Sequence, residues 1–172
     1  MQKDRIAIIG VGCRFPGGVS SKDSLWQLLV EGREGIIEVP PDRWNVERYY
    51  DAEPGVAGKS IALRGGFIDA IDQFDPQFFG ISPREAPYVD PQHRLLLETA
   101  WEAIEDAGLV LDFEKGTDLG VFVGISHNDY QGLQSTPSDH FGISAHTPTG
   151  SAHSIAANRI SYCLNLRGPS VA

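Results

Sequence analysis

The chain has 172 residues, a formal net charge of -9 at pH 7, and a composition that is 41% hydrophobic and 22% charged. These values fit a soluble globular protein that can bury a core, and the acidic balance argues against a nucleic-acid surface, which needs basic residues to neutralise phosphates. No apolar run approaches the ~20 residues of a membrane span, so we expect a soluble, cytoplasmic protein with no nucleic-acid and no membrane partner.

The first predicted element is a buried strand over residues 5–13. Its sequence, RIAIIGVGC, is continuously apolar, which is typical of a strand covered on both faces and favours an α/β architecture. Gly10 and Gly12 resemble the start of a dinucleotide-binding turn, but Phe15 stands where the third glycine should fall. We therefore expect a tight turn here, and a nucleotide-binding oxidoreductase remains only a remote alternative.

A helix is predicted next, over residues 21–31, with Ser20 or Ser21 as its N-cap. Its apolar face is expected to comprise Leu25, Trp26, Leu28 and Leu29. Residues 32–66 carry Pro and Gly pairs and are expected to be irregular. A connection of this length is more often functional or interface-forming than idle.

Aromatic residues concentrate in residues 67–82, which hold four Phe among acidic residues and no Lys or Arg. We expect these rings to anchor the loop to the core, since a base-stacking surface would carry cations. A well-formed helix follows, with Asp90 as N-cap, Pro91 at the first helical position and Gly108 as C-cap. Its apolar face is expected to hold Leu96, Leu97, Ala100, Trp101, Ala103, Ile104 and Ala107.

The last third of the chain is predicted to contain a second buried strand over residues 118–126 and a polar loop over residues 127–148. A helix should follow in the stretch that starts at Thr149, because mostly small apolar residues recur there at helical spacing and form a narrow stripe of Ala152, Ala156, Ile160, Cys163 and Leu164. Gly168-Pro169 should end it, and Ser170 to Ala172 are predicted to begin a strand.

This order of elements predicts a layered α/β domain with a mixed or parallel sheet. A sheet whose last strand has only begun exposes an edge and half of its apolar face. We therefore expect residues 1–172 to form an incomplete domain.

The residues themselves contain no complete catalytic or metal-binding set. The histidines lack the i, i+4 spacing of a helical metal site, so we expect them to face solvent, to cap helices or to form hydrogen bonds in the core. They are His93, His127, His140, His146 and His153. Cys13 and Cys163 lie in apolar settings without a CxxC pattern, so both are expected to be structural thiols in a reducing compartment.

Four segments occur in order along the chain: IAIIGVGCRFPGG, FDPQFFGISPREA, VDPQHRLLLETAWEAIEDAG and GSAHSIAANRISYCLNLRGPSVA. Together they strongly resemble the N-terminal part of β-ketoacyl synthase domains, especially those of type I polyketide and fatty-acid synthases. The resemblance implies a thiolase-like fold, of which this chain would supply the N-terminal half only, within a homodimer.

The resemblance also implies the chemistry of the intact enzyme, a decarboxylative Claisen condensation of acyl and malonyl thioesters. A Cys accepts the acyl group from the phosphopantetheine of an acyl carrier protein, and two His assist the later steps. No cofactor would be bound directly. The partners implied are the acyl carrier protein and the C-terminal half of the ketosynthase.

By this resemblance the nucleophilic Cys would lie a few residues beyond Ala172, in a DTACSS-like turn, and both catalytic His in the second half. Cys13 and Cys163 do not match the nucleophile, and His93 and His153 do not match the catalytic histidines. We therefore expect a chain that is truncated before the nucleophile turn, is inactive alone and contains no catalytic residue.

What the resemblance carries over is supporting structure. The segment from His127 to Ser151 resembles the edge of the acyl pocket near the dimer contact, and Asn158 to Leu164 resembles the helix buried beside it. The pocket-edge or dimer-interface residues implied are His127, Asn128, Tyr130, Thr149, Gly150, Ser151, Asn158, Ile160 and Tyr162. An alternative is a non-catalytic ketosynthase-like half used for dimerisation or carrier-protein docking.

Overall fold

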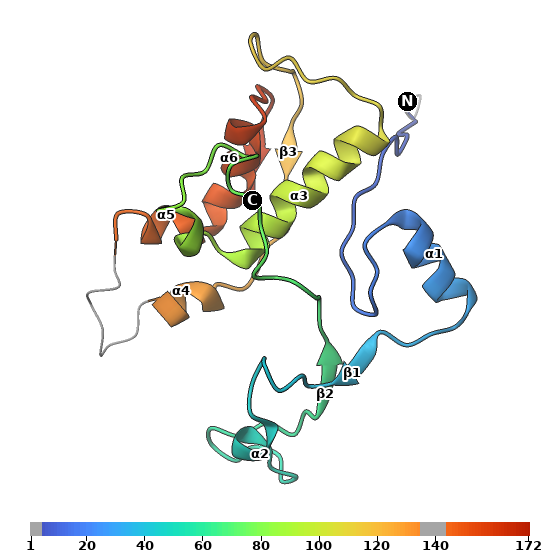
Figure 1. Ribbon diagram of the computed structural model, residues 1–172, viewed down its shortest axis with the longest axis vertical. Helices are drawn as coiled ribbons and strands as arrows, with labels where there is room; N and C mark the ends of the chain where they lie inside the picture. The colour runs from blue at the N-terminus through green and yellow to red at the C-terminus, as the bar shows by residue number, and fades with distance from the viewer. Residues whose placement is uncertain (1–4, 135–143) are drawn as a thin grey trace. The chain divides into compact units, whose positions relative to one another are not determined.

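The computed structural model describes residues 5–134 and 144–172, which fall into two compact units (Figure 1). The first unit joins the residues up to Gly12 to Ile71–Ala172, and the second unit is Cys13–Ala70. The predicted loop at 127–148 crosses residues 135–143, which lie outside the described residues, as does His140.

The second unit contains α1 (Lys22–Val30), β1 (Ile36–Glu38), α2 (Val46–Tyr49) and β2 (Arg64–Gly66). Helix α1 confirms the prediction for residues 21–31, and Ser21 is its N-cap. The side chains of Ser21 and Ser24 each accept the other's backbone N–H, which satisfies two donors of the first turn. The predicted apolar face is only half right, because Trp26 and Leu29 are exposed.

Residues 32–66 are more ordered than expected. Strands β1 and β2 pair antiparallel, with Ile36 opposite Gly66 and Glu38 opposite Arg64. The prediction of an irregular segment was therefore wrong at both of its ends. Strands of three residues are too short to show the alternation that identifies a strand in sequence.

The first unit contains η1 (Ala86–Tyr88), α3 (Pro91–Asp106), β3 (Val121–Phe122), α4 (Asp129–Gln134), α5 (Thr147–Ser151), α6 (His153–Cys163) and β4 (Ser170–Val171). Its core lies where α3 packs on α6 and is closed by the preceding loop. The buried members of this core are Phe79, Ile81, Val89, Leu97, Ile160 and Leu164.

The aromatic residues at 67–82 anchor their loop as predicted, but some of their rings pack in the first unit and one packs in the second. Phe79 is buried and stacks on Phe74 with ring centroids 5.4 Å apart. Phe78 packs edge-on against Trp101 of α3. Phe67 belongs to the second unit, where its ring lies 5.6 Å from that of Trp44.

Helix α3 confirms the predicted N-cap, whereas its C-cap is Ala107, one residue before the predicted Gly108. The Asp90 carboxylate accepts the Gln92 backbone N–H at 2.8 Å, and Pro91 occupies the first turn. Gly108 follows the helix with φ +64°, a conformation in which glycine carries no steric cost. Leu97 is fully buried on the core side.

The predicted final helix is two helices. Ala152 has an extended backbone (φ -66°, ψ 129°), so it ends α5 and begins α6. Of the predicted stripe, Ala156, Ile160 and Leu164 are buried. Beyond Gly168-Pro169, β4 confirms the predicted strand and pairs in parallel with β3.

The two long strand predictions were wrong in extent. β3 covers two residues of the segment 118–126, and Phe122 is exposed. Residues 5–13 form no strand, and Ile6, Ile8 and Ile9 are exposed. A strand is defined by its neighbours, and no strand among the described residues pairs with this segment. The α/β class holds, because α3 and α6 pack beside the parallel pair.

No helix among the described residues has both the length and the apolar character needed to traverse a bilayer.

Candidate functional site

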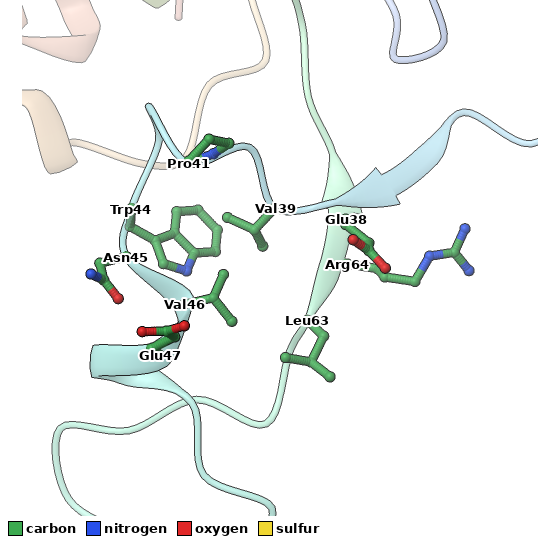
Figure 2. Close-up of a pocket in the computed structure, with 9 residues that line it drawn as sticks. All are labelled: Glu38, Val39, Pro41, Trp44, Asn45, Val46, Glu47, Leu63 and Arg64. Atoms are coloured by element: carbon green, nitrogen blue, oxygen red, sulfur yellow. The ribbon is translucent and has the colours of Figure 1, made fainter.

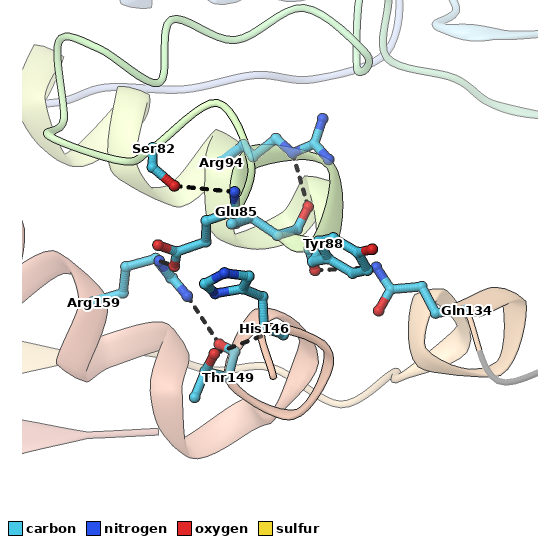
Figure 3. Close-up of polar contacts among 9 residues, drawn as sticks. Ser82, Glu85, Tyr88, Arg94, Gln134, His146, Thr149 and Arg159 are labelled. Carbon is cyan, nitrogen blue, oxygen red and sulfur yellow. Dashed lines mark hydrogen bonds and ion pairs between the residues drawn. The ribbon is translucent and has the colours of Figure 1, made fainter. Parts of the chain in front are cut away.

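The polar residues of the first unit converge where η1, α3, α5 and α6 meet, a region we call the polar junction (Figure 3). At its centre Arg159 of α6 donates to Glu85 Oε1 at 2.7 Å and to the Thr149 carbonyl at 2.9 Å. The Arg159 side chain is 9% exposed and that of Glu85 is 24% exposed. Arg159 therefore links α6 to the start of η1 and to α5. Removing either partner of the buried pair would leave an uncompensated charge.

The backbone of the polar junction is equally close-packed. The Asp90 N–H donates to the Gly150 carbonyl at 2.8 Å, which joins the start of α3 to α5. A Cβ on Gly150 would lie 2.0 Å from the Tyr88 carbonyl oxygen. Gly150 is therefore required for this approach of α5 to η1.

His93 is the most deeply buried titratable side chain of the junction, at 1% exposure. Burial, together with the positive charges of Arg159 and His153, lowers its pKa to about 4, and burial is the largest of these causes. Neither ring nitrogen has a hydrogen-bond partner among the described residues. His93 is consequently neutral at pH 7. It lies in the core, but the core hydrogen bond expected for such a histidine is absent among the described residues.

Next to His93, the carboxylate of Asp90 is also buried. Burial raises the pKa of this carboxyl group, while hydrogen bonds from Gln92 act in the opposite direction. Its role is structural, because it accepts the free backbone N–H of Gln92 in the first turn of α3.

The sequence-predicted residues at 127–130 lie beside this helix end. The His127 carbonyl accepts Gln92 Nε2 at 3.0 Å and His153 Nε2 at 2.9 Å. The Tyr130 hydroxyl donates to the Pro87 carbonyl at 2.6 Å. Asn128 is exposed and bonds Gln131. A cavity of about 490 Å³ opens here, lined by Ile71, Asp90, Pro91, Gln92, His127, Asp129, Tyr130 and Leu133.

The predicted residues of α5 are engaged in the protein's own packing. The Ser151 hydroxyl is buried and donates to the Thr147 carbonyl at 3.0 Å. The Thr149 carbonyl is held by Arg159, as described above, and its hydroxyl donates to the His146 carbonyl at 3.2 Å. Both hydroxyls already have partners within the protein. Thr149 and Ser151 would therefore shape a pocket through the position of their backbone.

Helix α6 divides the remaining predicted residues between two faces. Ile160 is buried in the core, whereas Asn158 is exposed and Tyr162 is 87% exposed. Residues four apart lie on one side of a helix, so Asn158 and Tyr162 share an outward face. The structure thus brings His127, Tyr130 and the α5 residues together at the polar junction and leaves Asn158 and Tyr162 apart from it.

The two cysteines lack the surroundings of a reactive thiol. Cys13 is buried, and burial raises the pKa of the Cys163 thiol. A raised pKa disfavours the nucleophilic thiolate at neutral pH. Within residues 5–134 and 144–172 no three His, Cys, Asp or Glu side chains form a group that could hold a metal ion.

An apolar groove lies between α3 and the strand pair. It has a volume of about 370 Å³, and nearly all of its lining side chains are apolar. Its lining residues are Leu96, Thr99, Ala100, Ala103, Ile104, Leu119, Gly120, Val121, Phe122, Val123, Ile160 and Leu166. Because the sheet stops at two strands, this groove and the face of Phe122 are open to solvent.

Sequence reasoning missed the Glu85–Arg159 pair and the role of His93. The available signal was Arg159, a single charged residue in a segment of small and apolar residues, since a charged residue is rarely buried unless it is paired. Its partner, 74 positions away in the chain, could not be read from local patterns.

Comparison with known proteins gives a consistent result. The family described as "Beta-ketoacyl synthase, N-terminal domain" matches residues 3–172. The mycocerosic acid synthase-like polyketide synthase of Mycolicibacterium smegmatis is 47% identical over 166 residues, which are 96% of this chain and 8% of that protein. Polyketide synthase GfsA of Streptomyces halstedii is 46% identical over 170 residues, 98% of this chain and 2% of that protein.

Solved ketosynthase domains are similar in structure. The oxazolomycin ketosynthase domain OzmH KS7 of Streptomyces albus matches with a TM-score of 0.84 and 38% identity, over 99% of this chain and 29% of that one. The ketosynthase from module 6 of the bacillaene synthase of Bacillus subtilis 168 matches with a TM-score of 0.75 and 35% identity, over 96% and 25% of the two chains.

Proposed function

Because this chain belongs to the family of beta-ketoacyl synthase N-terminal domains and has their thiolase-like fold, we propose that it forms the first part of a polyketide-synthase ketosynthase. The intact enzyme would join acyl and malonyl units, delivered on the phosphopantetheine of an acyl carrier protein, by decarboxylative Claisen condensation. The chain spans only 8% of the length of the mycocerosic acid synthase-like relative, so this activity is proposed for a longer polypeptide that carries the sequence.

The observation that carries the proposal is the set of hydrogen bonds that fixes β4 and the turn before it. The Val121 N–H donates to the Pro169 carbonyl at 2.7 Å, and the Gly168 N–H donates to the Leu119 carbonyl at 3.0 Å. The hydroxyls of Ser161 and Ser170 also bond each other. A strand fixed in this way can position a nucleophile that follows it, and a nucleophile must be held within a fraction of an ångström.

The supporting residues have two proposed roles. His127, Asn128 and Tyr130, with Thr149, Gly150 and Ser151, would set the backbone at the edge of the acyl pocket. Asn158 and Tyr162 would lie in the dimer contact of the parent enzyme, since an 87% exposed Tyr is costly to leave in water and is enriched at interfaces.

A second candidate is a non-catalytic half that serves dimerisation or carrier-protein docking. The outward face of Asn158 and Tyr162 favours it, because an interface requires no nucleophile. A cooperative thermal transition of the chain alone, together with a stable dimer in sedimentation, would support this candidate.

Acyl loading tests the proposal. The chain of residues 1–172 should gain no acyl mass when it is incubated with acyl carrier protein and weighed by mass spectrometry, whereas a longer polypeptide continuing past Ala172 should gain one acyl group. A stoichiometric thioester on Cys13 or Cys163 of the shorter chain would contradict the assignment of both as structural thiols.

A further inference from the structure

The second unit carries a cavity that the proposed condensation does not use (Figure 2). It has a volume of about 670 Å³ and lies between the strand pair and α2. Its lining residues are Glu38, Val39, Pro41, Trp44, Asn45, Val46, Glu47, Leu63 and Arg64. All of them belong to the second unit, so the cavity is complete within it.

The apolar part of the cavity is held in place by a backbone hydrogen bond and by ring packing. Val39 is buried, and its N–H donates to the Leu63 carbonyl at 3.1 Å, which fixes the base of the cavity. Trp44 is 39% exposed, and its ring packs at 5.6 Å on Phe67. A large aromatic ring that is fixed on one side and exposed on the other loses little entropy on binding a partner.

The charges around the cavity are mainly negative. The Arg64 guanidinium donates to Glu34 at 3.1 Å and to the Ile36 carbonyl at 2.7 Å. Glu38 and Glu47 have no ion-pair partner among the described residues. Figure 2 shows Glu47 beside Trp44, whereas the Arg64 guanidinium extends away from that ring.

We propose that this cavity is the docking site of a basic peptide segment in which an apolar side chain is flanked by Arg or Lys. The apolar side chain would occupy the space between Val39, Trp44 and Leu63. An adjacent cation would lie over Trp44 within reach of Glu47, where a cation–π contact and an ion pair act on the same charge.

Charge complementarity selects this occupant over the others. An acidic partner, including a second copy of this chain with its net charge of -9, would place like charges against Glu38 and Glu47. A nucleic acid would be repelled for the same reason. The proposal stands independently of the proposed condensation activity.

Calorimetric titration tests the proposal with a synthetic probe, acetyl-GSLRWLRSG-amide, and the whole 172-residue chain. Trp44→Ala should weaken binding by about tenfold or more, because the ring contributes both apolar area and the cation–π contact. Trp26→Ala is the matched control, since Trp26 is 64% exposed on α1 of the same unit and lies outside the cavity. It should leave the affinity unchanged.

The electrostatic part has its own variants. The double change Glu38→Gln and Glu47→Gln should weaken binding by roughly three- to tenfold at low salt and by less at high salt. Glu53→Gln, an exposed glutamate of the same unit that does not line the cavity, is the control. All four glutamine and alanine variants should keep the circular-dichroism spectrum of the parent chain, because the changed side chains are exposed.

Three outcomes would overturn the proposal. One is equal binding of a probe whose Arg residues are replaced by Glu. Another is probe binding that Trp44→Ala does not alter. The third is self-association of the chain that Trp44→Ala abolishes, which would assign the cavity to a second copy.

Discussion

At the scale of single residues, His93 is the side chain whose chemistry its surroundings change most. Its ring is buried between α3 and the positive charge of Arg159, which lowers its pKa from 6.5 to about 4. In the unfolded chain the same ring is solvated and takes up a proton near pH 6.5. Between these two values the unfolded state binds more protons than the folded state, so stability must rise with pH.

We therefore predict that the free energy of unfolding falls by about 3 kcal/mol as the pH is lowered from about 6.5 to about 4. His93→Gln should remove most of this dependence, because glutamine does not titrate. Chemical denaturation of both chains at several pH values measures the effect.

The comparison between the two chains is needed because Asp90 titrates nearby. Burial raises the pKa of Asp90, so its contribution has the opposite sign and is lost as the pH rises through the shifted value. Asp90 is common to both chains, so its contribution cancels in the difference. Identical pH profiles for the two chains would contradict the assignment of the dependence to His93.

At the scale of elements, residues 5–12 are fixed to α3 through their backbone. The Val11 N–H donates to Asp106 Oδ2 at 3.0 Å. A Cβ at Gly10 would lie 2.2 Å from the Ala103 carbonyl oxygen, and one at Gly12 would lie 2.2 Å from the Thr99 carbonyl oxygen. The expected tight turn is therefore wrong. These glycines allow the segment to lie directly on the helix, and neither has positive φ.

We predict that Gly10→Ala and Gly12→Ala each lower the free energy of unfolding by roughly 1–3 kcal/mol or more, since α3 and the segment must separate. Thermal denaturation provides the measurement. Gly124→Ala is the control, because a Cβ at Gly124 meets no atom within 4 Å. An equal loss at Gly10 and Gly124 would contradict the assignment of the cost to close packing on α3.

The same contrast explains what the sequence could predict. The start of α3 was predictable, because an Asp cap and a first-turn Pro act within a few residues. The absence of a strand at residues 5–13 was not predictable. Continuous hydrophobicity indicates burial in a complete sheet, but it does not identify the neighbouring strand.

The candidate site was predictable to a similar degree. Its members at 127–130 and 149–151 were identified through the resemblance. Their hydrogen bonds to Gln92, Pro87 and Arg159 were not predicted. Such contacts join distant parts of the chain and leave no local pattern.

At the scale of the whole chain, large apolar side chains are exposed in the first unit, both on β3 and in the segment before Gly12. Phe122 is 72% exposed and Ile6 is 96% exposed, and the groove beside β3 is apolar. An open strand edge with an apolar face invites association with another polypeptide segment. In a ketosynthase we expect this face to be covered by the remainder of the sheet.

Phe122→Gln is therefore predicted to reduce binding of a hydrophobic dye to the chain alone and to slow its aggregation. In a longer polypeptide the same change should lower stability by about 2 kcal/mol, because the ring would be buried there. Light scattering and denaturation measure the two effects. Val110→Gln, at a 93% exposed position outside the groove, is the control and should change neither. A destabilised short chain would show instead that Phe122 already packs within it.

The parallel pairing of β3 and β4 also imposes an order on folding. Roughly 50 residues separate Val121 from its partner Ser170, so the chain must close a long loop before these strands meet. Helices α3 and α6 can form from local contacts much sooner. The hydrogen bonds from Val121 to Pro169 and from Val123 to Val171 depend on that closure. We therefore expect β4 to reach its position after α3 and α6 have formed.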